Sequence, residues 1–159
     1  MRDLGCYPAA HSAFLLNLGL ETLAVRMERH CANAQRTAEF LESRDAVEFV
    51  NYPGLKQNKY HALAQKYLPK GCCGVISFSI KGGRERAAAF IDHLKMVSLE
   101  VHVADIRTCI LHPASSTHRQ LTDEQLVNCV ITPGLIRLSC GIEHIDDILE
   151  DLTQAFAQI

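Results

Sequence analysis

The sequence predicts an α/β domain in which a small, mostly antiparallel sheet is covered by helices on one face and is preceded by a long helix. Two observations lead to this fold class. Apolar residues recur every three or four positions over residues 12–44, which is the spacing of one helix face. Further along, short segments of alternating apolar and polar residues are separated by segments with helical spacing, a pattern typical of strands with covering helices.

Bulk properties fit a single soluble domain. The chain has 159 residues, is 48% hydrophobic and carries a formal net charge of −2. This weak charge gives no electrostatic reason to bind nucleic acid or an anionic membrane. The longest apolar run, residues 13–20, is too short to cross a bilayer and lacks the flanks of a signal peptide. We therefore expect a cytoplasmic protein with no nucleic-acid or membrane partner.

The helix over residues 12–44 is expected to bend at Gly19 and to be roughly 45 Å long. A compact domain of this size has a radius of gyration of only about 15 Å. The helix should therefore extend beyond the body and pack on a missing neighbour. Its apolar stripe consists of Leu16, Leu20, Leu23, Met27, Cys31, Ala34, Ala38 and Leu41.

The next elements are a short strand and a short helix. Residues 46–51 alternate, which places Val47 and Phe49 on one strand face. Asn58 can cap a helix that ends before Pro69 and Gly71. The residues expected to face inward from this helix are Tyr60, Leu63, Ala64 and Tyr67.

A clear strand follows over residues 74–80. Ile76, Phe78 and Ile80 should face the core, with Ser77 and Ser79 on the other side. A helix over residues 82–95 should then bury Ala87, Phe90, Ile91 and Leu94. The Gly82–Gly83 pair lacks the spacing of a phosphate-binding loop and predicts a turn.

Residues 98–106 also alternate and predict a strand. Leu99, Val101 and Val103 would share one face, and Glu100 and His102 the other, polar face. The pattern then loosens over residues 104–132, a length at which loops often carry function.

Within that loose stretch, Thr122 and Gln125 form the sequence pattern of a capping box and predict a helix start. A strand then follows over residues 135–142. Ile136 and Leu138 should face the core, with Arg137 and Ser139 on the opposite face.

The chain closes with a helix whose first turn gains from Asp146 and Asp147. Its expected inward residues are Ile145, Ile148, Leu149, Leu152 and Phe156. The sheet should thus leave one polar face bare, to meet water or another domain. That face would carry Ser77, Ser79, His102, Arg137 and Ser139.

The seven cysteines are scattered and odd in number, so they indicate neither a disulfide scaffold nor a zinc site. His112 and His118 lack the helical spacing of metal ligands, and we expect no metal. A nucleophile at Cys72 or Cys73 would need a base at a recognisable spacing, and none is present. Buried or incidental thiols are the preferred interpretation.

Arg137 is the residue that needs an explanation, because a permanent charge interrupts an apolar strand. It could lie on the open face of an edge strand with its aliphatic stem on neighbouring side chains. Alternatively, its guanidinium could clamp a carboxylate through two parallel hydrogen bonds. The pattern alone leaves both interpretations open.

Five blocks of sequence resemble the C-terminal half of the Cys/Met-metabolism family of pyridoxal-phosphate enzymes, with the O-acetylhomoserine sulfhydrylase branch nearest. These blocks are AFLLNLGLETLAVRMERHCANA, FVNYPGL, YLPKGCCGVISFSIKGG, HPASSTH and GLIRLSCGIEHIDDILEDL. The resemblance implies the small domain of the aspartate-aminotransferase-like, type I fold. Residues 1–44 would be a linking helix and residues 45–159 the C-terminal small domain.

The same resemblance implies roles for three residues. Arg137, in the RLS block, would bind the α-carboxylate of the amino-acid substrate. Thr117 would lie beside that pocket, and His102 stands at a substrate-side position where the family usually has Asn or Ser. Near the N-terminus, Ala10 and Ser12 also depart from the family pattern.

Pyridoxal-phosphate chemistry needs a Schiff-base lysine, an acid at the pyridine nitrogen and a phosphate cradle. The resemblance places these in a large domain that precedes the matched region, so we expect the chain to be inactive alone and Met1 to be an internal start, an introduced start or a gene truncation. The lysines present are Lys56, Lys59, Lys66, Lys70, Lys81 and Lys95, and none lies in a family active-site block.

The expected activity is replacement of the acetoxy group of O-acetylhomoserine by a thiol, in a homo-oligomer that includes the large domain. Two alternatives stay open. The chain could be a non-catalytic orphan or a partner-dependent assembly domain. It could also be the corresponding domain of a cystathionine γ-synthase or γ-lyase, or of a methionine γ-lyase.

Overall fold

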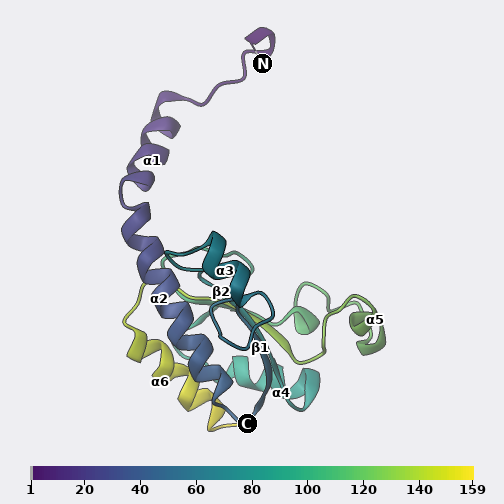
Figure 1. Ribbon diagram of the computed structural model, residues 1–159. Coiled ribbons are helices and arrows are strands. Elements are labelled where there is room, and N and C mark those ends of the chain that lie inside the picture. Colours follow the sequence, from purple (N-terminus) through teal and green to yellow (C-terminus); the bar gives the residue numbers. More distant parts are fainter. Residues whose placement is uncertain (1) are drawn as a thin grey trace.

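The computed structural model describes residues 2–159 and shows a five-stranded sheet with helices packed on one face (Figure 1). The strand order across the sheet is β1-β2-β5-β4-β3. The strands are β1 (Val47–Asn51), β2 (Val75–Ile80), β3 (Ser98–Leu99), β4 (Cys109–Leu111) and β5 (Leu135–Ser139). The α-helices are α1 (Ala10–Glu21), α2 (Leu23–Glu42), α3 (His61–Tyr67), α4 (Gly83–Asp92), α5 (Asp123–Asn128) and α6 (Ile145–Phe156). Short 3-10 helices, η1 (Arg2–Leu4) and η2 (Pro113–Ser115), complete the described elements.

The sheet is antiparallel except at one edge, where β3 pairs with β4 in parallel. The expected α/β class with a mostly antiparallel sheet is therefore confirmed. The central strand β5 lies between β2 and β4, with Arg137 opposite Ser77 on one side and opposite Leu111 on the other. Arg137 is consequently not on an edge strand, and the interpretation that placed it there was wrong on this point.

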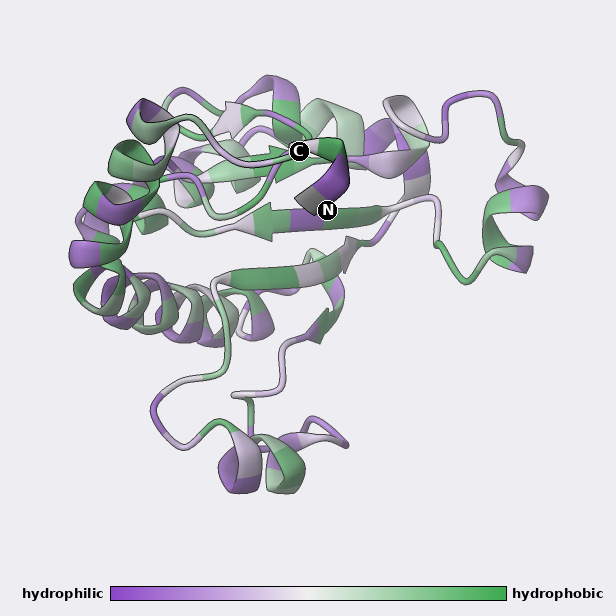
Figure 2. Ribbon diagram, turned by 90° about the horizontal axis from the view of Figure 1, so that it is seen from above, coloured by the Kyte–Doolittle hydropathy of each residue, from purple (hydrophilic) through white to green (hydrophobic). Residues whose placement is uncertain are grey.

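The core lies between the sheet and the helices α2, α4 and α6, which line one side of it (Figure 2). Ile76, Phe78, Ile136 and Leu138 are fully buried, as their alternation with polar residues predicted. Phe78 meets Phe90 of α4 edge to face, with ring centroids 6.3 Å apart. The inward faces predicted for α4 and α6 are confirmed by the burial of Ala87, Phe90, Ile91, Ile148 and Leu152.

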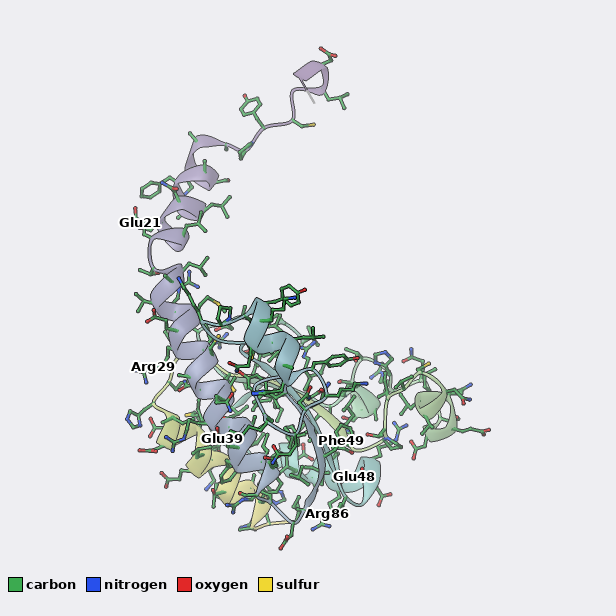
Figure 3. The ribbon with its side chains drawn as sticks, in the orientation of Figure 1. Glu21, Arg29, Glu39, Glu48, Phe49 and Arg86 are labelled. Carbon is green, nitrogen blue, oxygen red and sulfur yellow. The ribbon has the colours of Figure 1, made fainter. Side chains whose placement is uncertain are left out.

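The long N-terminal helix is divided at Thr22 into α1 and α2, and not at Gly19 as expected. Arg26 stabilises the break, because its guanidinium donates to the Gly19 carbonyl at 2.5 Å and to Thr22 Oγ1 at 3.3 Å. The Gly19 carbonyl is an acceptor that an uninterrupted helix would use in its own backbone ladder. The expected projection beyond the body is confirmed: α1 has no buried residue and extends away from the sheet (Figures 1 and 3).

Two strands differ from their prediction. A bulge between Val47 and Phe49 shifts the register of β1, so Val47 is buried whereas Phe49 is 40% exposed. The strand expected over residues 98–106 is only two residues long, because the chain beyond Glu100 leaves the ladder as an irregular loop. Leu99, Val101 and Val103 are accordingly exposed.

The short helix α3 begins at His61, one turn after its predicted cap. Asn58 still accepts a hydrogen bond from the Tyr60 backbone N–H at 2.9 Å, but outside the helix. Ala64 is its only buried residue, so the predicted inward face is wrong for Tyr60, Leu63 and Tyr67. By contrast, the capping box of Thr122 and Gln125 is present at the start of α5.

The polar sheet face is partly covered and not bare as expected. Ser79 is buried and bonds to Glu48 and to Thr132, while Ser139 is buried under the loop that follows β3. No helix among residues 2–159 combines the length and apolar composition that crossing a membrane requires.

Candidate functional site

Arg137 is positioned by the middle of the sheet. Its strand, β5, is hydrogen-bonded on both sides, and the residues before and after it, Ile136 and Leu138, are fully buried. Such a strand fixes the direction of the arginine stem. The guanidinium therefore emerges from a rigid base on the face opposite the helices.

One half of the guanidinium is held by the loop that follows β3. Arg137 Nη2 donates to the Val101 carbonyl oxygen at 2.5 Å and to the His102 carbonyl oxygen at 3.4 Å. Arg137 Nε, in contrast, is buried and has no partner among residues 2–159. A buried donor without a partner is costly, and a guanidinium fork matches two carboxylate oxygens. The geometry thus leaves Arg137 oriented, and the donor free for an anion is Nη1, which makes no hydrogen bond among residues 2–159 and is not one of the buried unpartnered atoms.

The loop itself is shaped by a left-handed residue and an ion pair. Ala104 has φ 64° and its N–H donates to Ser139 Oγ at 3.1 Å. Asp105 accepts from the backbone N–H of Arg107 at 2.9 Å and from its guanidinium at 3.3 Å. The Arg107 backbone N–H, followed by its side chain, lowers the pKa of the Asp105 carboxyl to about 2. The loop that holds Arg137 is therefore internally braced.

His102 presents its carbonyl and its imidazole to different neighbours. The carbonyl faces Arg137, whereas Nε2 of the half-exposed ring lies 2.6 Å from Glu100 Oε2 and 3.1 Å from Asp105 Oδ2. The structure thus brings His102 and Arg137 together through the backbone.

Thr117 lies apart from this pair. It is exposed after η2, and its Oγ1 lies 2.9 Å from Nδ1 of the adjacent His118. The neighbouring His112 is buried and spans the segment, with Nδ1 near Ser115 Oγ and Nε2 near the Pro133 carbonyl. Burial lowers the pKa of His112, so it acts as a neutral brace for the loop. Between Thr117 and Arg137 the described residues show no hydrogen bond.

Sequence reasoning named His102 as a site residue but missed the backbone carbonyls that support Arg137. The carbonyls of Val101 and His102 reach it across 36 and 35 positions of the chain, which periodicity cannot reveal. The Asp105–Arg107 pair, two residues apart, was the one local signal that a braced loop lies there.

Comparison with known proteins places this geometry in a family. The family model for Cys/Met metabolism PLP-dependent enzymes matches residues 1–157. The chain belongs to that family. Its arginine-bearing strand and braced loop are thus elements of an enzyme family that depends on pyridoxal phosphate.

Individual relatives match 92 to 100% of the chain. An O-acetyl-L-homoserine sulfhydrylase of Leptospira meyeri is 46% identical over 100% of this chain and 36% of its own length. A homocysteine synthase of Schizosaccharomyces pombe is 45% identical over 98% of this chain and 36% of its own. An L-methionine gamma-lyase of Treponema denticola is 44% identical over 92% of this chain and 36% of its own.

A solved structure agrees with the fold. An O-acetylhomoserine (thiol)-lyase of Campylobacter jejuni, crystallised with a pyridoxyl-lysine monophosphate, matches with a TM-score of 0.86 and 44% identity. The match covers 98% of this chain and 37% of that one. This chain therefore spans about a third of the length of the relatives that it matches.

Proposed function

We propose that this chain forms the substrate-side domain of an O-acetylhomoserine sulfhydrylase-like enzyme, in which Arg137 binds the α-carboxylate of the amino-acid substrate. The observation that carries the proposal is the hydrogen bonding of the Arg137 guanidinium. Nη2 is held by two backbone carbonyls, whereas Nη1 makes no hydrogen bond among the described residues. A carboxylate is the ligand that would satisfy such a fork through charge-assisted hydrogen bonds. Sulfhydrylases among the relatives at 41 to 46% identity support the choice of substrate class.

In this proposal the β3–β4 loop and the η2 segment border the substrate. His102 acts through its carbonyl, which helps to fix Arg137, while Thr117 contributes a hydroxyl at the edge of the pocket. The guanidinium does no chemistry on the substrate. It orients the amino acid so that the reacting atoms meet the cofactor in one geometry, which is the entropic part of catalysis.

The lysines of this chain do not fit the cofactor site. A Schiff base needs a lysine activated by its surroundings, together with a phosphate cradle. All six lysines here are exposed. We therefore assign the cofactor to a large domain outside residues 1–159, present in the same polypeptide or in a partner, and expect this chain alone to be inactive.

The helix α1 supports that assignment, because it is largely apolar and yet has no buried residue. Phe14 is 60% exposed, Leu16 68% and Leu20 60%. A helix that is hydrophobic all round is normally buried. We propose that residues 1–44 link the small domain of residues 45–159 to the large domain, which would cover α1 in a homo-oligomer of the complete enzyme.

The test is substitution of Arg137 in the complete, cofactor-bearing enzyme. Arg137→Ala should lower kcat/KM for O-acetylhomoserine with sulfide by about 30- to 1000-fold, which corresponds to roughly 2 to 4 kcal/mol. Arg137→Lys should recover only part of this, since an ammonium cannot form the two-pronged contact. Arg86→Ala is the matched control: its guanidinium lies on α4, on the helical side of the sheet (Figure 3), and bonds only to the Lys81 carbonyl. An unchanged kcat/KM in Arg137→Ala would refute the clamp.

Methionine γ-elimination is the second candidate activity, because a methionine γ-lyase is nearly as similar as the sulfhydrylases. The same enzyme preparation should be assayed with methionine alone and with O-acetylhomoserine plus sulfide. Release of methanethiol at the higher kcat/KM would replace the sulfhydrylase assignment. The role of Arg137 would stand in either case, since both substrates carry an α-carboxylate.

A further inference from the structure

A second cluster of reactive side chains lies next to the clamp and is not used by the proposed function. Glu100, His102 and Cys109 each direct one ligand atom to a common point, and these atoms all lie within 4.8 Å of one another. His102 Nε2 is 2.6 Å from Glu100 Oε2, and Cys109 Sγ is 3.7 Å from Glu100 Oε2 and 4.0 Å from His102 Nε2. Asp105 Oδ2 approaches the same imidazole nitrogen at 3.1 Å.

The fold builds this cluster on the parallel edge of the sheet. Cys109 begins β4 and is buried, opposite Ser98 of β3. The Glu100 N–H donates to the Ile110 carbonyl at 3.1 Å, which extends the β3–β4 pairing to that residue. The backbone ladder therefore fixes two of the ligands, Glu100 and Cys109, and the brace between Asp105 and the Arg107 N–H fixes the carboxylate beside the imidazole. His102 completes the set from the loop between them.

The combination of ligands is that of a zinc-type site. A thiolate, an imidazole and carboxylates are the groups that bind Zn²⁺, at bond lengths of about 2.0 to 2.3 Å. Tetrahedral geometry with such bonds separates neighbouring ligand atoms by roughly 3.4 Å. The two sulfur distances already lie near that value, and the imidazole–carboxylate pairs have to open slightly as the ion replaces their hydrogen bonds.

Charge balance also favours a cation. The carboxylates of Glu100 and Asp105 share one guanidinium, since Arg107 lies 3.4 Å from Glu100 Oε1 and 3.3 Å from Asp105 Oδ1. A coordinated thiol loses its proton, so Cys109 would bind a divalent ion as a thiolate. One thiolate, two carboxylates, one guanidinium and one Zn²⁺ sum to zero charge.

We propose that Glu100, His102 and Cys109 form a binding site for a divalent cation of zinc type, with Asp105 beside the imidazole. The site lies outside the substrate clamp but shares a residue with it: the His102 imidazole faces the cation, and the His102 carbonyl holds Arg137. Sequence spacing did not reveal the site, because Cys109 joins Glu100 and His102 through strand pairing, and the expectation of no metal was drawn from the pattern alone.

The test uses Co²⁺ as a spectroscopic probe and Zn²⁺ as its competitor, on the polypeptide that carries this sequence as its source makes it. We expect one equivalent of Co²⁺ to give a thiolate-to-metal charge-transfer band and tetrahedral ligand-field bands, both removed by Zn²⁺. Cys109→Ser should abolish the charge-transfer band, and His102→Asn should weaken Co²⁺ binding at least about tenfold. Cys129→Ser, which alters an exposed cysteine on the far α5 segment, should leave the bands unchanged.

Three results would overturn the site: absence of a band in the wild type, a full band in Cys109→Ser, or unaltered Co²⁺ affinity in His102→Asn. His102 is half-exposed, so its variant should fold even where the buried Cys109 does not tolerate serine. The readout is independent of catalysis. Loss of metal binding with an intact substrate clamp, or the reverse, would therefore separate this inference from the proposed function.

Discussion

Arg137 Nη2 donates a hydrogen bond of 2.5 Å to the carbonyl oxygen of Val101, a residue 36 positions earlier in the chain. This contact ties a charged side chain of the central strand to a loop at the edge of the sheet. The loop therefore acts as one wall of the candidate site, and its conformation determines where the guanidinium points.

Ala104 should be a strained position in that wall. Its φ of 64° lies in the left-handed region, which costs an L-residue roughly 1 kcal/mol or more. Ala104→Gly should raise the free energy of unfolding by about 1 kcal/mol, measured by urea denaturation. Ala88→Gly, in the middle of α4, is the opposite control and should lower it by about 0.5 to 1 kcal/mol. Destabilisation by both glycines would show that Ala104 is unstrained.

Asp151 should hold the connection between α4 and β3. Its buried carboxylate accepts the backbone N–H groups of Lys95, Met96 and Val97, each at 2.9 Å. Burial raises the pKa of Asp151, but these hydrogen bonds together outweigh it, so the net shift is downward. Asp151→Asn should cost about 1 to 3 kcal/mol of unfolding free energy at pH 7.

The stabilisation by Asp151 should depend on pH in a definite direction. A lowered folded-state pKa means that Asp151 stabilises the fold above its unfolded pKa, near 3.8, and stops doing so as the pH falls through the folded value. The gap between wild type and Asp151→Asn should therefore close in acid. Glu150→Gln, an exposed carboxylate on the same helix, should show little difference at either pH. A gap that is constant from pH 7 to pH 3 would contradict the charged role.

The same Leu→Ala substitution should have different effects on the free energy of unfolding in α1 and in α2. Leu41 is fully buried, so Leu41→Ala should cost about 2 to 5 kcal/mol of unfolding free energy. Leu16 is 68% exposed, so Leu16→Ala should cost less than about 0.5 kcal/mol in the 159-residue chain. Urea denaturation of the two variants provides the comparison. Similar losses would mean that something already covers α1 in this chain.

The sequence predicted the elements that bury one clean face. Alternation located β2 and β5, and the polar caps located α5, because each signal is local and the core enforces it. The alternation pattern gave a wrong prediction at β1, where a bulge turns Phe49 outward. It was also wrong after Glu100, where apolar residues alternate without entering the sheet. A bulge or an early strand end depends on partners far along the chain, which periodicity does not contain.

In the candidate site, too, the sequence revealed local features but not contacts between distant residues. Arg137 was identified from its position in an apolar strand, and its proposed role came from the family resemblance. The supporting carbonyls of Val101 and His102 and the Glu100–His102–Cys109 cluster were missed. They arise where the loop after β3 folds back over β5 and β4, and tertiary contacts of this kind leave no spacing in the sequence.

The central claim, that Arg137 binds the substrate carboxylate, is tested most directly by a double-substitution cycle on the complete enzyme. kcat/KM is measured for O-acetylhomoserine and for its α-carboxamide, with wild type and with Arg137→Ala. If the guanidinium meets the carboxylate, the amide is strongly disfavoured by wild type but not by the variant, with a coupling energy of about 2 kcal/mol or more. An equal preference for the carboxylate in both enzymes would show that another group recognises it and that Arg137 does not.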